Sequence, residues 1–258
     1  MGKVVNRLRE SKTKLKSLPF NKMAPNLVTL LALCSGLSSI KFSILGDWER
    51  AVIFIFVAGV LDGLDGRVAR LLKAESKFGA ELDSLSDFLC FGVAPSILLY
   101  QWTMSDAGGL GWFLCMLYTI CMCLRLARFN TMLEDEPMPT YWQHFFVGVP
   151  APAAAAIVLL PVLISFDLPV DIDWVKSNYF SGIMLCLVAI LMVSKIPTFS
   201  SKKAKVPSFM IVPLMLFVTL FASYMISQPW MTLAAIVGIY LLSIPVGILF
   251  FISQKKKS

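Results

Sequence analysis

The chain has 258 residues, of which 57% are hydrophobic and only 15% are charged, and its mean hydropathy is +0.76. Soluble domains contain about 45–50% apolar and about 25% charged residues. The composition therefore argues against a soluble globular enzyme, a disordered chain and a secreted disulfide scaffold, and it predicts a polytopic membrane protein. The six cysteines fall within apolar stretches, and their spacing matches neither a C-x-x-C pair nor a Cys/His metal site.

Apolar windows long enough to cross a bilayer, about 20 residues each, follow one another along the chain. They cover residues 26–45, 50–71, 79–101, 109–129, 144–166, 179–195, 208–227 and 230–253. We therefore expect an all-α membrane bundle of about eight transmembrane helices. It forms a single membrane domain over residues 24–253, preceded by a basic segment, 1–23, and followed by a basic tail, 254–258.

Positive charge orients this bundle. Of the 23 Lys and Arg residues, 20 fall at the two termini, in alternate loops or at the window ends that adjoin those loops. Basic loops stay on the cytoplasmic side, so both termini are predicted to be cytoplasmic. The net charge of +7 follows from this bias and needs no nucleic-acid partner. The first 23 residues suit either a basic amphipathic helix on anionic lipid or a solvated tail.

Four aspartates lie within or at the ends of the second and third windows. Asp62 and Asp65 are three residues apart, and Asp83 and Asp87 are four apart, so each pair shares one helix face. A charged side chain at the bilayer centre costs about 2.5–3.5 kcal/mol on insertion scales. Four acids in two helical pairs therefore point to a functional site and not to helix caps.

The residues around these acids suit a phosphate-binding metal site. Mg²⁺ prefers oxygen ligands and is often bound by a few carboxylates together with substrate phosphates. Two such ions, about 3.5–4 Å apart, would clamp a pyrophosphate. Gly66 and Gly79 leave room for a phosphate or a ribose near the backbone, Ala69 keeps the same face narrow, and Arg70 can form a fork on a phosphate.

Residues 62–87 read D-x-x-D-G-x-x-A-R-x8-G-x3-D-x3-D, which resembles the signature of the CDP-alcohol phosphotransferases at all eight defining positions. This resemblance implies that an acceptor hydroxyl attacks the β-phosphorus of a CDP-linked lipid or alcohol and that CMP is released. The implied metal ligands for two Mg²⁺ or Mn²⁺ ions are Asp62, Asp65, Asp83 and Asp87, and Asp87 is also the implied general base. The implied CDP-binding residues are Asn26, Thr29, Asp62, Gly66, Ala69, Arg70 and Gly79. Asn26 and Thr29 equally suit the start of a helix.

Three further segments resemble the phosphatidylserine synthases within this family. They are FGVAPS (91–96), RLARFN (125–130) and HFFVGVP (144–150). This resemblance implies transfer of the phosphatidyl group from CDP-diacylglycerol to L-serine. Arg125, Arg128 and Asn130 would bind the acceptor, since a guanidinium matches a carboxylate, although both arginines equally suit positive-inside anchors. Glycerol 3-phosphate or an inositol phosphate stays open as the acceptor.

Two other classes of protein also place acids among membrane helices. A Mg²⁺ transporter would use them as an ion pathway, but it does not need the Gly66, Ala69, Arg70 and Gly79 spacing. A prenyltransferase has Asp-rich clusters without this Arg/Gly framework. The enzyme hypothesis is therefore preferred. The resemblance implies a homodimer, and the charge bias predicts a bacterial inner-membrane protein with its active site facing the cytoplasm.

Overall fold

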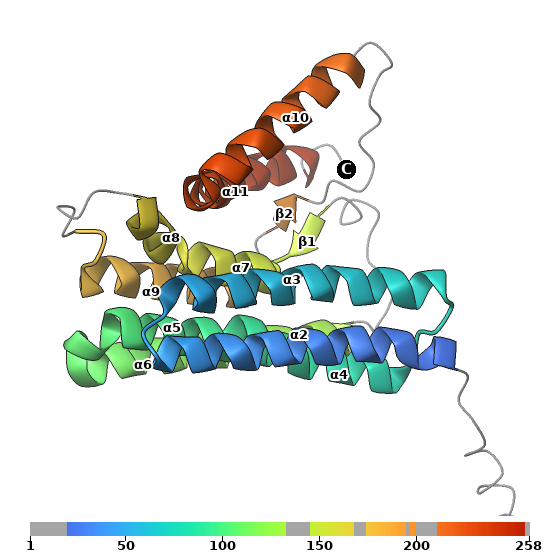
Figure 1. Cartoon of the computed structure of the whole chain (residues 1–258), viewed down its shortest axis with the longest axis horizontal. Coiled ribbons are helices and arrows are strands. Elements are labelled where there is room, and N and C mark those ends of the chain that lie inside the picture. The colour runs from blue at the N-terminus through green and yellow to red at the C-terminus, as the bar shows by residue number, and fades with distance from the viewer. Residues whose placement is uncertain (1–19, 133–144, 168–173, 195–196, 200–210, 256–258) are drawn as a thin grey trace, which may run out of the picture.

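The computed structural model describes residues 20–132, 145–167, 174–194, 197–199 and 211–255, most of which are helical (Figure 1). The helices are α2 (Phe20–Ile44), α3 (Trp48–Leu71), α4 (Lys77–Asp87), the π-helix η1 (Phe88–Val93), α5 (Ala94–Trp102), the 3-10 helix η2 (Met104–Ala107), α6 (Gly108–Met132), α7 (Ala151–Val158), α8 (Leu160–Asp167), α9 (Asn178–Val193), α10 (Ile211–Ser227) and α11 (Pro229–Lys255). Most of the predicted basic N-terminal segment and the last three residues of the tail lie outside the described residues.

Four stretches of the described helices are long and apolar enough to cross a membrane. They are Met23–Ile44, Lys77–Trp102, Met104–Thr131 and Pro229–Gly247. Helix α9 is apolar but has only 16 residues, and α3 has 24 residues but carries the first acidic pair in its C-terminal half. The prediction of an integral membrane protein built as a helix bundle is therefore confirmed.

The window at 144–166 differs from its prediction as one continuous helix. Strand β1 (Phe145–Val147) pairs antiparallel with β2 (Pro197–Phe199), and two short helices, α7 and α8, follow it. Gly148 has a φ of +78°, a left-handed conformation that ends the strand, and Pro150 caps α7. Pro161 has no N–H to donate to the preceding turn, which favours a break between α7 and α8.

The core of the bundle lies between α3, the π-helix, α5, α6 and α7. Its largest fully buried side chains include Phe91, Leu98, Tyr118, Met122 and Ile157. Helix α6 packs against α9 and the π-helix, while α11 packs on α8 and β2. Helices α10 and α11 lie on the side of the bundle away from α2 and α4 (Figure 1).

Helix α2 positions the two helices that carry the acids. It packs along α3 on one side and against α4 and the π-helix on the other (Figure 1). Small residues permit the close approach to the π-helix, because a Cβ at Gly36 would lie 2.6 Å from the Cys90 sulfur. The turn from α3 to α4 is short, with Lys73 in a left-handed conformation (φ +50°) and Ser76 accepting a hydrogen bond from the Gly79 amide at 3.0 Å. The C-terminal half of α3 thus lies opposite α4.

Candidate active site

The predicted acidic faces meet between α3 and α4. A carboxylate oxygen from each of Asp62, Asp83 and Asp87 lies within 4.8 Å of the others, and all three side chains are half-buried. In the part of the chain that the structure describes, this is the one group of three or more such residues close enough to share a metal ion. Three of the four acids that the sequence pairs on two helix faces thus lie together in the structure.

Asp65, the fourth predicted metal ligand, has a different environment. It is only 5% exposed and accepts a hydrogen bond from the Thr29 hydroxyl at 2.6 Å. Thr29, predicted to contact the nucleotide, thereby ties α2 to α3 beside the cluster. The structure thus brings three of the four acids together and holds the fourth, also on α3, by a hydrogen bond to α2. No local sequence signal pairs Thr29 with Asp65, because the contact depends on how α2 and α3 pack.

The three clustered carboxylates fit a divalent cation. Like charges this close repel one another, and burial weakens the screening by water. A hard cation with oxygen ligands removes the repulsion, and Mg²⁺ or Mn²⁺ matches a donor set of carboxylates without His or Cys. The cluster could therefore hold a metal ion, with Asp65 as an adjacent fourth carboxylate.

A cavity of about 570 Å³ opens beside the cluster, between α2, α3 and α4. Asp65 and Asp83 form part of its wall at the end nearest the cluster. The lining contains every predicted CDP-binding residue except Asp62, namely Asn26, Thr29, Gly66, Ala69, Arg70 and Gly79. Sequence reasoning missed Glu75 and Ser76, which line the cavity from the turn between α3 and α4.

The two glycines act differently in this cavity. A Cβ built on Gly66 would meet no atom within 4 Å, so the backbone of α3 faces open space there. A Cβ on Gly79 would lie 3.0 Å from the Asn26 amide oxygen and 3.1 Å from the Ser76 hydroxyl. Gly66 therefore leaves space for a ligand, whereas Gly79 lets α4 approach α2 and still cap its own first turn. Arg70 is a cation in the wall of the same cavity.

The three predicted acceptor residues lie at the C-terminal end of α6 and have different partners. The Arg128 guanidinium donates to the carbonyls of Met192, Val193 and Ser194 at 3.1, 2.7 and 3.4 Å, which caps the end of α9. The Asn130 amide donates to the Ser84 hydroxyl at 3.0 Å and so joins α6 to α4.

Arg125 alone of these three faces the acids. Its guanidinium interacts electrostatically with Asp87. The Nε atom is buried and has no hydrogen-bond partner among the described residues. Arg125 therefore supplies a positive charge beside the cluster and retains a donor for a further group.

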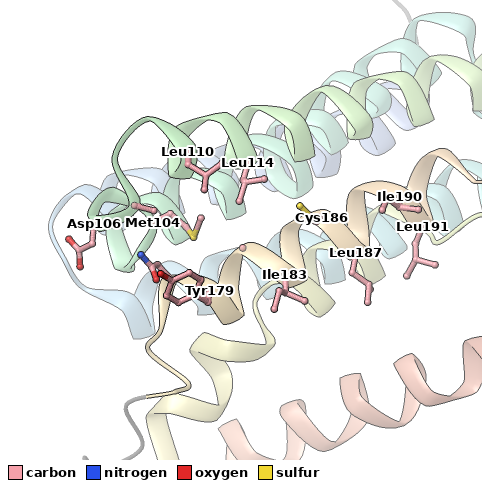
Figure 2. Close-up of a pocket in the computed structure, with 13 residues that line it drawn as sticks. Met104, Asp106, Leu110, Leu114, Tyr179, Ile183, Cys186, Leu187, Ile190 and Leu191 are labelled. Carbon is pink, nitrogen blue, oxygen red and sulfur yellow. The ribbon is translucent and has the colours of Figure 1, made fainter.

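A second, larger cavity of about 930 Å³ lies between α6, η2 and α9 (Figure 2). Apolar side chains such as Leu110, Leu114, Ile183 and Leu187 line most of it, and none of the predicted site residues does. None of the clustered aspartates lines it, so it is a different cavity from the one beside the acids.

Comparison with known proteins agrees with the site. A sequence model of the family described as CDP-alcohol phosphatidyltransferase matches residues 22–194, and that of CDP-alcohol phosphatidyltransferase 2 matches residues 210–245. Three similar bacterial proteins bear the name CDP-diacylglycerol–serine O-phosphatidyltransferase. The Mycobacterium leprae protein is 39% identical over 88% of this chain and 75% of its own length. The Helicobacter pylori protein is 35% identical over 87% and 91%, and the Bacillus subtilis protein 36% identical over 67% and 87%. The chain belongs to the CDP-alcohol phosphatidyltransferase family.

Proposed function

We propose that this protein transfers the phosphatidyl group of CDP-diacylglycerol to the hydroxyl of L-serine, giving phosphatidylserine and CMP. The observation that carries the proposal is the acidic cluster at one end of a cavity lined by the signature residues. This arrangement suits a nucleotide in the cavity with its pyrophosphate at the carboxylates. The names of the three relatives support serine as the acceptor.

The reaction uses Asp87 as the general base. The serine oxygen forms a bond to the β-phosphorus, the bond from that phosphorus to the bridging oxygen of CMP breaks, and CMP leaves with the bonding electrons. Asp87 accepts the hydroxyl proton as the new bond forms, which is the usual role of a positioned carboxylate. Arg70 in the cavity wall binds a phosphate oxygen of the donor.

Asp62, Asp65, Asp83 and Asp87 would hold Mg²⁺ or Mn²⁺, two ions per active site. When bound, these ions supply positive charge to the pyrophosphate and so stabilise the charge that develops during transfer. Before a metal binds, the hydrogen bond from the Thr29 hydroxyl holds the Asp65 carboxylate beside the other acids. Because the carboxylates lie close to one another, the position of each carboxylate also depends on the positions of the others.

The proposed transfer to serine is tested by measuring CMP release by the purified protein in detergent. CDP-diacylglycerol is supplied with Mg²⁺ or Mn²⁺ and with L-serine, glycerol 3-phosphate, an inositol phosphate or no acceptor. We expect release that requires L-serine and stops when EDTA removes the metal. Release with only another acceptor would overturn serine but keep the acidic machinery. No release from folded protein with any acceptor would overturn the enzyme hypothesis.

Among the predicted acceptor residues, we propose that Arg125 binds the serine carboxylate. Its buried Nε has no partner in the described part of the chain, whereas Arg128 already caps α9. We expect Arg125→Ala to raise the KM for serine about ten- to a hundredfold, the range for losing a charged hydrogen bond. Arg128→Ala, three residues away, is the matched control. It is expected to lower the melting temperature and leave the KM for serine unchanged, and the reverse pattern would reassign the two roles.

We further propose eight membrane spans, cytoplasmic termini and a homodimer in a bacterial inner membrane. The basic residues Arg67, Arg70, Lys73 and Lys77 around the turn between α3 and α4 support a cytoplasmic position for the cavity, since it adjoins this turn. The nucleotide part of the donor is water-soluble, which suits the same face. Reporter fusions at both termini test the orientation. The protein mass in detergent, relative to the 28.6 kDa chain, tests the dimer.

A further inference from the structure

The π-helix η1 begins immediately after Asp87. It changes the direction in which the side chains of α5 point relative to those of α4. Its Ala94 amide donates to the Leu89 carbonyl five residues earlier, whereas an α-helix uses the carbonyl four residues earlier. Each residue of an α-helix turns by about 100°. The extra residue therefore lets α4 present Asp83 and Asp87 to α3 while α5 keeps Leu98 in the core. Without it, one of these two faces would be rotated away by about that angle.

A fully buried tyrosine on α6 stabilises this π-helix. The Tyr118 hydroxyl donates to the Phe91 carbonyl at 2.7 Å, and Tyr118 has no exposed surface. The neighbouring Thr119 hydroxyl is hydrogen-bonded mainly to the Cys115 carbonyl at 3.0 Å and the Ser96 hydroxyl at 2.7 Å, and it lies 3.4 Å from the Gly92 carbonyl. Gly92 itself must be small, because a Cβ there would lie 3.1 Å from the Cγ of Met122. One short hydrogen bond, from Tyr118, and one tight packing contact, at Met122, therefore join α6 to the π-helix.

The same face of α6 continues to the acidic cluster. Tyr118, Met122 and Arg125 follow at intervals of four and three residues, so they form one stripe along α6. Arg125, at the end of the stripe, interacts electrostatically with Asp87. Irregular turns of this kind often occur at functional sites, because they redirect a side chain.

We propose that Tyr118 is a positioning residue for Asp87. Its hydroxyl keeps the π-helix in the register that points the Asp87 carboxylate toward Asp62 and Asp83. Tyr118 does not touch the substrates and acts only through the backbone that follows Asp87. The catalytic part of this inference rests on the proposed function, whereas the geometry of the cluster does not.

The test compares Tyr118→Phe, which removes only the hydroxyl, with wild type in two measurements. The first is Mn²⁺ affinity, measured by electron paramagnetic resonance, and the second is kcat for CMP release. We expect Mn²⁺ to bind about tenfold more weakly and kcat to fall about tenfold, because both depend on the Asp87 carboxylate. The KM for CDP-diacylglycerol is expected to change less than twofold, since neither Tyr118 nor Asp87 lines the nucleotide cavity.

Thr103→Val is the matched control. It also removes a buried hydroxyl, which donates to the Lys176 carbonyl at 2.9 Å, but at the far end of α5. This variant is expected to keep wild-type Mn²⁺ affinity and kcat. A Tyr118→Phe protein with unchanged Mn²⁺ affinity would overturn the proposal, as would an equal loss of affinity in Thr103→Val.

Two further outcomes are distinguishable. If wild type releases no CMP, the proposed function fails, but Mn²⁺ affinity still decides whether Tyr118 orders the cluster. If Tyr118→Phe does not fold, Gly92→Ala takes its place, because a Cβ at Gly92 would lie 3.1 Å from the Met122 Cγ and so disturb the π-helix next to the carbonyl that Tyr118 binds. We expect this variant to bind Mn²⁺ about threefold more weakly, and wild-type affinity would overturn the proposal.

Discussion

Replacing Asp87 with asparagine is expected to abolish CMP release almost completely while the protein still inserts and folds. Asparagine has the same shape but cannot accept the serine proton, and a positioned general base contributes about 10²–10⁴-fold to a rate. The variant also loses one carboxylate of the cluster, so Mn²⁺ is expected to bind more weakly. The measurement is kcat for CMP release at saturating serine and metal.

The matched control for this variant is Glu81→Gln. Glu81 lies on the same helix, α4, is exposed and is absent from both the cluster and the cavity lining. It undergoes the same chemical change, from a carboxylate to an amide, and should retain wild-type kcat. Turnover by Asp87→Asn within a few fold of wild type would remove Asp87 as the base, whereas an equal loss in Glu81→Gln would indicate a general effect of charge.

Filling the cavity at Gly66 is expected to have the second large effect. In Gly66→Leu the new Cβ meets no atom within 4 Å and the side chain extends from a residue that lines the cavity, so we expect the fold to tolerate it. That space belongs to the cavity beside the acids, so the nucleotide is excluded. We expect at least about a hundredfold loss of kcat/KM for CDP-diacylglycerol, the result of a steric block that repacking of α3 cannot relieve. Binding of free CDP, measured by calorimetry, should be lost in parallel.

Gly63→Leu provides a close control on the same helix. A Cβ at Gly63 also meets no atom within 4 Å, but Gly63 does not line the cavity. Both variants replace a glycine within a helix by leucine; glycine is about 0.8–1 kcal/mol less favourable there than alanine, and leucine ranks close to alanine, so neither variant should lower the melting temperature. CDP binding that survives in Gly66→Leu would contradict the nucleotide assignment of this cavity. CDP binding lost in both variants would indicate a change in α3 as a whole.

Hydropathy predicted helices of this protein, and helical spacing predicted that acids from two helices would face one another. The apolar windows correspond to helices because a membrane leaves a chain few other ways to satisfy its backbone polar groups. Asp62 and Asp83 could be expected in one cluster, since their helices are joined by a short turn and each acidic pair shares a face. The CDP positions followed from the family resemblance of the 62–87 motif and of Asn26 and Thr29, and all but Asp62 line one cavity.

The structure differs from the sequence-based predictions where the partner of a residue is distant in the sequence. Arg125 and Arg128 look alike in RLARFN, yet one faces Asp87 and the other caps α9. The Thr29–Asp65 hydrogen bond joins residues 36 apart, and the break at 144–166 accompanies a strand that pairs with residues about 50 positions later. Local periodicity carries no information about such pairs.

The sequence by itself thus determined the membrane class, the acidic chemistry and the signature of this protein, because these depend on composition and on spacing within one or two helices. Only the tertiary structure decided that α3 and α4 both pack on α2, with a cavity beside the acids. It also placed a π-helix after Asp87, with a hydrogen bond from Tyr118 on a helix 27 residues away. The physical reason is that helix packing, and not helix propensity, sets the direction in which each carboxylate points.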